Sequence, residues 1–275
     1  MSRVIYRKNN DDEWKQITEV YMQSFFKEPL KAKQQKAAYD RVKLLIENNI
    51  TTFIVAENTG LLIGISGITN HISSSFIGYV AVIPTFRNMG IGTNLFDISL
   101  QEALKHNPTV ELFANPGPDK IYQHFGFQEE YRTNIYNLTK IPNEKNHEFE
   151  IITKTIPNWV LKLDKETMGF DRAKFLKVLV AHDYHLLLAP KKGFVFFTDA
   201  KIGPCIAKKP KLSVEMIKHI VSIKGNIDIV LPEMLEQHIQ IFSPIKKNSC
   251  IKMCFGKPIR RILPRVWSFE SFATG

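Results

Sequence analysis

Residues 76–92 read FIGYVAVIPTFRNMGIG and join an apolar strand to a glycine-containing loop. The first part, 76–83, shows little alternation of apolar and polar residues, which is typical of a strand covered on both faces in the middle of a sheet. Pro84 ends this strand, and the two glycines come directly before an apolar pattern with helical spacing. The stretch therefore predicts a strand, a turn-rich loop and the start of a helix, an order found in α/β proteins.

The loop 87–92 has the composition of an anion-binding turn. Glycine tolerates the positive φ angles of a concave nest, in which backbone N–H groups converge on one anion. The helix that follows adds unpaired N–H groups and the positive end of its dipole, and Arg87 adds a full charge. These features predict a diphosphate site that needs no metal. The longer glycine pattern of dinucleotide-binding folds and the Gly-Lys-Ser/Thr sequence of the Walker loop are both absent.

Strand and helix signals alternate through the rest of the first half. Strands are expected at 4–7, 51–56, 61–69, 110–114 and 135–138. Helices are expected at 31–47, at 119–124 and, after the glycine loop, through Leu95, Ile98, Leu100 and Leu104. A further helix begins at a cap supplied by Asp11 or Asp12 and places Ile17 and Val20 inward. The strands 51–56 and 61–69 form a hairpin around the turn Asn58-Thr59-Gly60.

The second half has the same character. Helices are expected at 171–181 and 213–223, strands at 186–189, 194–198 and 227–231, and an extended stretch from Cys250 onward. A chain of 275 residues exceeds the usual domain of about 100–200 residues. We therefore expect an α/β (α+β) protein of two domains, 1–145 and 150–275, each a mixed central sheet flanked by helices, with a polar linker near 143–147.

Composition excludes several classes of protein. No apolar run approaches the length of roughly 18 residues that a membrane helix needs, and no secretion signal is visible, so we expect a soluble, cytoplasmic protein without membrane partners. The three cysteines, an odd number, are expected to be reduced packing thiols. The net charge of +10 belongs almost wholly to the second half, because residues 1–145 carry 16 Lys+Arg against 15 Asp+Glu. Scattered lysines favour a solvated surface over a nucleic-acid interface.

Three features at fixed spacing carry a family resemblance. The glycine loop is followed by Asn115, by Tyr122 seven residues later, and by Gly126-Phe127. Together these resemble the Gcn5-related N-acetyltransferase (GNAT) superfamily over roughly residues 3–140. The resemblance implies an acetyl-CoA-dependent N-acetyltransferase acting on a primary amine: a small metabolite, a peptide N-terminus or a lysine of a protein. A non-catalytic acetyl-CoA-binding sensor or interaction module is the alternative.

The resemblance also implies roles for individual residues. The cofactor-binding set is Val80, Ala81, Val82, Arg87, Asn88, Met89, Gly90, Ile91, Gly92, Thr93, Asn115 and Tyr122. Loop N–H groups would hold the pyrophosphate, the strand backbone would pair with the pantetheine arm, and one strand N–H would polarise the thioester carbonyl. Asn115 would contact the coenzyme near its sulfur. Tyr122 would be catalytic and protonate the departing thiolate, although a tyrosine packed between helix and sheet is the plainer interpretation. No metal is implied.

The general base is not assigned. Many relatives carry a carboxylate in the strand equivalent to 76–83, whereas Gly78 and Tyr79 stand there in this chain. Glu111 on a neighbouring strand could act through water, but a surface or strand-end glutamate is the favoured interpretation. His106 and His124 are interpreted as structural.

Three stretches of the second half carry a further resemblance: Gly169-Phe170-Asp171-Arg172, Ile202-Gly203-Pro204, and the end from Met253-Cys254-Phe255-Gly256 through Trp267-Ser268-Phe269 to Gly275. They resemble the C-terminal domain of tandem acetyltransferases of the YitH type. The match of Val82 to Ile206 and of Pro116 to Pro232 gives similar offsets, 124 and 116, as an internal duplication should. Residues 205–211, which stand where the glycine loop should be, contain no glycine, and no Tyr-x-x-x-Gly-Phe follows. We therefore expect no acetyl-CoA site in this half, which would instead wall the substrate cleft. Possible wall residues, each also a plausible core residue, are Trp159, Phe170, Arg172 and Trp267.

Overall fold

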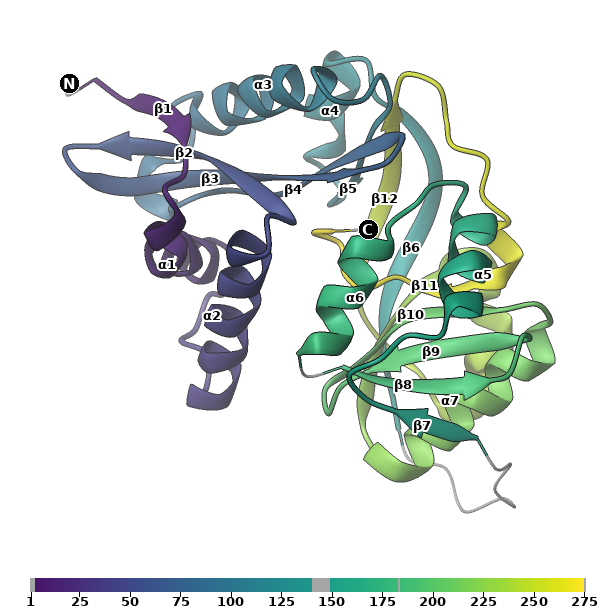
Figure 1. Cartoon of the computed structure of the whole chain (residues 1–275). Coiled ribbons are helices and arrows are strands. Elements are labelled where there is room, and N and C mark those ends of the chain that lie inside the picture. The colour runs from purple at the N-terminus through teal and green to yellow at the C-terminus, as the bar shows by residue number, and fades with distance from the viewer. Residues whose placement is uncertain (1–2, 140–148, 183, 275) are drawn as a thin grey trace. The chain divides into compact units, whose positions relative to one another are not determined.

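The computed structural model describes residues 3–139, 149–182 and 184–274 (Figure 1). Contacts between residues divide the chain, in the main, into two compact units, Met1–Leu112 and Phe113–Ala273. Each unit is a mixed α/β structure with a sheet and flanking helices. The predicted fold class is therefore confirmed, whereas the linker expected near 143–147 lies outside the described residues.

The first unit is built on five strands in the order β1-β2-β3-β4-β5. The strands are β1 (Ile5–Lys8), β2 (Thr51–Asn58), β3 (Leu61–His71), β4 (Ser74–Val82) and β5 (Val110–Ala114), whose last residues pass into the second unit. The helices are α1 (Trp14–Phe25), α2 (Ala32–Glu47) and α3 (Ile91–Leu104), and the 3₁₀ turns are η1 (Asp11–Glu13) and η2 (Pro84–Phe86). Neighbouring strands are antiparallel except β4 and β5, which are parallel.

The sheet of the first unit is covered on both faces (Figure 1). Helix α3 lies on one face and α1 on the other, and both contact β3 and β4. Leu95 of α3 and Ile17 of α1 are fully buried, as is Phe53 of β2. Burial on both sides explains why the sequence of β4 shows no alternation.

The second unit contains the remaining strands in the order β12-β6-β11-β10-β9-β8-β7, with β13 also paired to β10. The strands are β6 (Gln128–Leu138), β7 (Glu150–Ile152), β8 (His185–Ala189), β9 (Gly193–Phe197), β10 (Lys201–Ala207), β11 (Ile227–Pro232), β12 (Ile245–Phe255) and β13 (Val266–Ser268). The helices are α4 (Asp119–His124), α5 (Asn158–Met168), α6 (Ala173–Ala181) and α7 (Pro210–Lys224), with the 3₁₀ segments η3 (Glu233–Phe242) and η4 (Leu263–Arg265). Its buried core includes Met216 and Ile220 of α7, Val195 of β9 and Trp267 of β13.

Strand β6 is longer than expected and pairs differently. The sequence predicted a strand only at 135–138, whereas β6 begins at Gln128 and pairs along its length with β12 and at its end with β11. These antiparallel ladders tie β6 to strands of the second half, which is why the contact boundary falls at Leu112 and not near 145. The domain limits 1–145 and 150–275 stay a prediction about evolutionary units.

Most predicted elements are present, but several predictions need correction, and β7 and η3 were not predicted. The first helix is preceded by a 3₁₀ turn whose N-cap is Asn10, so the expectation of a cap at Asp11 or Asp12 is wrong; the Asn10 N–H donates to Glu13 Oε2 at 2.7 Å. Helix α5 was not predicted. Strand β10 was not predicted either, and it includes residues 205–207, which had been interpreted as loop.

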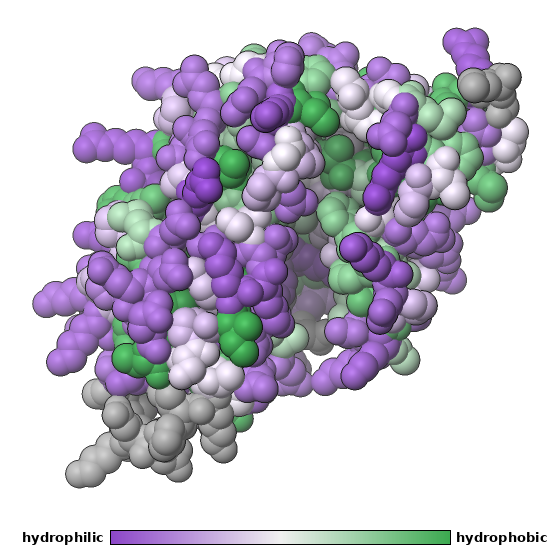
Figure 2. All heavy atoms as spheres, turned by 180° about the vertical axis from the view of Figure 1, so that it is seen from behind, coloured by the Kyte–Doolittle hydropathy of each residue, from purple (hydrophilic) through white to green (hydrophobic). Residues whose placement is uncertain are grey.

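None of the helices in the described ranges is both long enough and apolar enough to cross a bilayer. Hydrophilic side chains cover most of the face seen in Figure 2, and apolar ones are scattered among them. All three cysteines are buried and none forms a disulfide, as expected for packing thiols.

Candidate functional site

Strand β4 contains a bulge beside its carboxyl end. Gly67 of β3 faces Gly78 and Ile65 faces Ala81, so Ser66 lies opposite both Tyr79 and Val80. Tyr79 has a φ of 54°, a left-handed conformation that a residue with a side chain rarely adopts. A bulge bends the strand and changes the direction of the neighbouring backbone groups. The predicted thioester-binding residues therefore begin at a point where the strand leaves its regular ladder.

The second edge of β4 is open next to this bulge. Of the described residues, only Ser75 and Phe76 of β4 pair with β5, and the parallel strands then diverge. Within the described part of the chain, Val80, Ala81 and Val82 are not in the register of β4 with β5. An extended ligand with amide groups can occupy such an edge as an added strand would.

The loop after β4 contains two left-handed residues directly before a helix. Asn88 and Gly90 both have left-handed conformations, with φ of 62° and 74°. Gly90 is the N-cap of α3, and no side chain caps this helix. The first N–H groups of a helix have no intrahelical acceptor, so Ile91, Gly92 and Thr93 present donors at the positive end of the dipole.

Both glycines keep space open above the loop. A Cβ at Gly90 would meet no atom within 4 Å, and a Cβ at Gly92 would meet only Val82 Cγ2, at 3.6 Å. The second distance shows that the helix start lies against the end of β4. Strand edge, loop and helix N-terminus are thus neighbouring parts of the first unit, in which the side chains of Ala81 and Ile91 are buried.

Arg87 is exposed, but its guanidinium is turned onto the backbone. Nε donates to Val82 O at 3.0 Å and Nη2 donates to Ser24 O at 2.7 Å. Both acceptors are neutral carbonyls, so these bonds fix the start of the loop without cancelling the positive charge. Arg87 therefore has a structural task that the sequence did not suggest.

Asn115 and Tyr122, predicted to lie near the reacting sulfur, belong to the second unit and share a neighbour there. Asn115 follows β5 and Tyr122 lies on α4. Cys250 of β12 donates through Sγ to Asn115 Oδ1 at 3.2 Å. Burial raises the pKa of Tyr122 to about 12, and the nearby Cys250 adds to this shift. Tyr122 is therefore fully protonated at neutral pH, as a proton donor must be.

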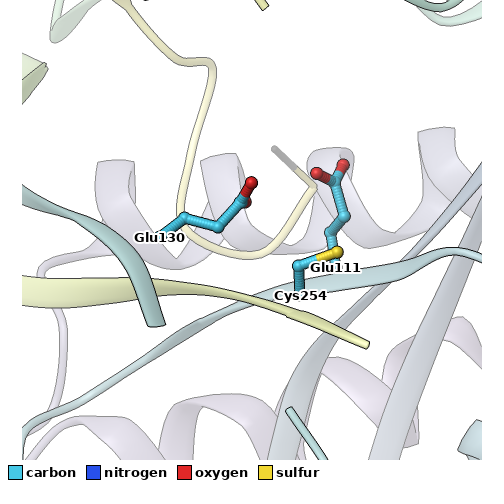
Figure 3. A group of neighbouring side chains, drawn as sticks. All are labelled: Glu111, Glu130 and Cys254. Atoms are coloured by element: carbon cyan, nitrogen blue, oxygen red, sulfur yellow. The ribbon is translucent and has the colours of Figure 1, made fainter. Parts of the chain in front are cut away.

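Two carboxylates deserve comparison as possible bases, Glu111 of β5 and Glu130 of β6, drawn with Cys254 in Figure 3. Glu111 is buried and accepts a hydrogen bond from Ser74 Oγ at 3.1 Å, a contact within the first unit. Glu130 lies 3.6 Å from the buried Nζ of Lys252. Neither arrangement identifies a base for an amine.

The two histidines interpreted as structural are exposed. Nδ1 of His124 lies 2.6 Å from Lys120 O on the same helix, and Nε2 of His106 lies 3.9 Å from Glu102. These local contacts agree with the structural interpretation.

The second half repeats the bulge but closes its open edge. Ile202 pairs with Phe197 and Cys205 with Val195, so Gly203 and Pro204 together face Phe196. Strand β10 then pairs with β13, not with β11, at Cys205 and Ile206. Strand β13 thus occupies the edge of β10 that corresponds to the open edge of β4.

The residues proposed as cleft walls lie mostly in the core of the second unit. Phe170, Arg172 and Trp267 are each no more than 6% exposed. The Arg172 guanidinium binds the buried Asp164 through Nε and Nη2. Core packing is therefore the better description of these three residues, whereas Trp159 is partly exposed.

Comparison with protein families supports this architecture in both halves. Residues 49–129 match one acetyltransferase (GNAT) domain model, and residues 160–263 match a second acetyltransferase (GNAT) domain model. Comparison with curated proteins gives no match.

Solved structures agree on the fold. A candidate acetyltransferase from Pyrococcus horikoshii superimposes with a TM-score of 0.92 at 24% identity, over 99% of this chain and 96% of that one. A GCN5-related N-acetyltransferase from Sphaerobacter thermophilus gives a TM-score of 0.61 at 12% identity, over 96% and 97% of the two chains. A tandem GNAT protein from the clavulanic acid biosynthesis pathway gives 0.65 at 11% identity, over 93% and 99%.

The first half therefore has the α/β arrangement of a strand edge, a glycine turn and a helix start without a side-chain cap. The chain belongs to the GNAT acetyltransferase family and carries two such domains in tandem. The likeness to the YitH type in particular stays a prediction.

Proposed function

We propose that this protein is an acetyl-CoA-dependent N-acetyltransferase acting on a primary amine. The observation that carries the proposal is the uncapped start of α3, preceded by left-handed Asn88 and Gly90 and adjoining the open edge of β4. This arrangement supplies converging donors for a diphosphate and an edge for an extended amide chain. No metal is needed for either contact.

In the proposed reaction, loop N–H groups bind the pyrophosphate of acetyl-CoA. The pantetheine arm follows the edge of β4 from Val80 to Val82, where one N–H beside the bulge stabilises the oxyanion that forms on the thioester. The neutral amine attacks the carbonyl carbon, so that a C–N bond forms and the C–S bond breaks. Tyr122 donates its proton to the departing thiolate, and the proton that the new amide nitrogen loses returns to the Tyr122 phenolate, so that the phenol is restored. Asn115 contacts the coenzyme near the sulfur.

A sensor that binds acetyl-CoA without reacting is the second candidate. The observation that favours it is the absence of a carboxylate on β4, where Gly78 and the packed ring of Tyr79 stand at the bulge. Such a protein would use the same nest and the same strand edge, so binding alone does not separate the two proposals.

One experiment tests both candidates. Acetyl-CoA is titrated into the full chain by calorimetry, and free thiol is then followed in the presence of small amines, peptides with free N-termini and lysine-containing peptides. Binding with amine-dependent thiol release supports the enzyme, and binding without release across the panel supports the sensor. The absence of binding contradicts both.

The titration also addresses the second half. We propose one coenzyme per chain, because β13 fills the edge of β10 that a second coenzyme would need. Two equal sites would contradict this asymmetry. The acceptor, the cytoplasmic location and the role of the second half as a cleft wall stay predictions.

A further inference from the structure

The thiol of Cys250 is placed beside both residues of the second unit that the proposed reaction uses. Cys250 lies on β12, in the C-terminal half of the sequence, and is 2% exposed. Its Sγ donates to Asn115 Oδ1 at 3.2 Å. Tyr122 is close enough for Cys250 to influence its ionisation. None of the features of the first half of the sequence predicts a group from residue 250 at this position.

We propose that Cys250 is a positioning residue that orients the Asn115 amide for the coenzyme. The inference rests on the proposed function, since Asn115 is assigned to the coenzyme there. A primary amide has an acceptor oxygen and a donor NH₂ group. When the oxygen accepts from Cys250, the NH₂ group is directed away from the thiol and is held as a donor for a carbonyl oxygen of the pantetheine arm. Strand β12, from the C-terminal half of the sequence, thereby fixes the orientation of the Asn115 amide.

A different role for Cys250, as a nucleophile that takes the acetyl group, is disfavoured by its ionisation. Burial raises the pKa of the Cys250 thiol to about 12. At pH 7 roughly one such thiol in 10⁵ is ionised, and the thiolate is the nucleophilic form. A neutral thiol that donates a hydrogen bond is consistent with this pKa, and a covalent acetyl-cysteine is not.

The test compares variants that keep or remove the donor. Cys250→Ala and Cys250→Val remove it, and Cys250→Ser keeps a hydroxyl in its place. Loss of one oriented hydrogen bond is expected to raise the Kd of acetyl-CoA by about fivefold to tenfold, with kcat within twofold of wild type. The serine variant should bind within about threefold of wild type. Cys205→Ala, which empties another buried thiol site, is the control for thermal stability alone.

A double-mutant cycle with Asn115→Ala separates positioning from packing. If Cys250 acts through Asn115, Cys250→Ala has no further effect on Kd once Asn115 is alanine. Additive losses would contradict the proposal, as would a folded Cys250→Ala or Cys250→Val protein with wild-type Kd. An acetyl group on Cys250, found by mass spectrometry after incubation with acetyl-CoA, would also overturn it.

The outcomes distinguish this inference from the function on which it rests. If the wild-type chain does not bind acetyl-CoA, the proposed function itself is wrong. If the wild type binds and the Cys250 variants bind equally well, only the role of Cys250 is wrong.

Discussion

The two halves of the molecule differ most where a central strand meets the helix that follows it. In the first half β4 ends at Val82 and α3 begins at Ile91, with residues 83–90 between them. In the second half β10 ends at Ala207 and α7 begins at Pro210, so that Lys208 and Lys209 alone form the connection. The long connection has room for the two left-handed residues Asn88 and Gly90, whereas a helix start without a side-chain cap is common to α3 and α7. The short one has no room for a nest.

The bulges show the same difference at the level of single N–H groups. Aligning Tyr79 and Val80 with Gly203 and Pro204 gives the offset of 124 that matches Val82 to Ile206. Val80 has a backbone N–H, whereas Pro204 has none. The second half therefore has a bulge at the matching position, with a φ of 141° at Gly203 against 54° at Tyr79, and it lacks the donor. A bulge at this position thus occurs without the catalytic task proposed for the first half.

A segment of the chain itself takes the ligand's place in the second half. The Phe269 N–H donates to Val230 O at 3.1 Å, and Ser268 Oγ donates to Ile202 O at 2.8 Å, so this segment bridges β10 and β11. Gly203 can approach it closely because it has no side chain; a Cβ there would lie 2.1 Å from Phe269 O. The edge of β10 that corresponds to the open edge of β4 is thus occupied by the protein's own backbone.

The largest effect is expected from closing the open nest. Gly90→Val introduces a β-branched side chain at a φ of 74°, at the position from which the α3 donors face a diphosphate. We expect acetyl-CoA affinity to fall by at least roughly 100-fold, because both the nest geometry and the access to the helix start are lost. Calorimetric titration measures this change.

Gly60→Val is the matched control for this prediction. Gly60 has a φ of 83° in the β2–β3 turn, and a Cβ there, as at Gly90, meets nothing within 4 Å. The two variants should lose similar stability through backbone strain, of about 1–2 kcal/mol, but only Gly90→Val should lose affinity. Equal affinities in the two variants would remove the nest from the proposed site.

The next largest effect concerns turnover. Tyr122→Phe removes the proposed proton donor and should lower kcat by roughly 100-fold, with the Kd of acetyl-CoA little changed because the ring still packs on Phe127. Full turnover in this variant would show that Tyr122 only packs. The change in kcat is measured from the rate of thiol release at saturating acetyl-CoA.

The pH dependence of the wild type sharpens this test. Because burial raises the pKa of Tyr122 to about 12, deprotonation of Tyr122 should cause no fall in kcat below about pH 11. The unfolded chain releases this proton first, near pH 10, so the stabilising contribution is present below pH 10 and is lost as the pH rises toward 12.

The sequence predicts the loop after β4 better than it predicts the closed edge of β10, for a physical reason. A nest needs glycine or asparagine at left-handed positions and a helix directly after it, so Asn88, Gly90 and Gly92 leave a visible pattern. A satisfied strand edge needs only apolar residues with free backbone groups, and β10 and β13 therefore leave no comparable pattern. The predicted loop at 205–211 failed for this reason, since residues 205–207 are strand.

Contacts between distant segments were also invisible in the sequence. The pairing of β6 with β11 and β12 joins the end of the first sequence motif to the second half, and no local periodicity encodes a partner strand. The Cys250 bond to Asn115 depends on this pairing. A cysteine in an apolar strand gives no sign of function, because most such cysteines only pack.

A smaller effect is expected from loosening the segment that closes the second half. Glu270 is completely buried and its carboxylate accepts from Tyr184 Oη at 2.6 Å and from Lys201 Nζ. Glu270→Gln removes the charge but keeps the size, and should lower the free energy of unfolding by about 1–3 kcal/mol, with acetyl-CoA affinity unchanged. Thermal unfolding measures the loss. Glu233→Gln, at a half-exposed pair with Lys246, is the control and should shift stability by less than about 0.5 kcal/mol.

The smallest effect is expected in the short connection between β10 and α7. Lys208 and Lys209 stand where the first half has its nest, and their charges could attract a phosphate without converging N–H donors. If charge alone were sufficient, the double variant Lys208→Gln/Lys209→Gln would remove a second, weaker binding event from the titration. We expect instead one coenzyme per chain in both proteins and affinities within about twofold, since β13 covers the strand edge and Pro210 replaces an N–H at the helix start. A second site that disappears in the double variant would show that both halves bind the coenzyme and differ only in affinity.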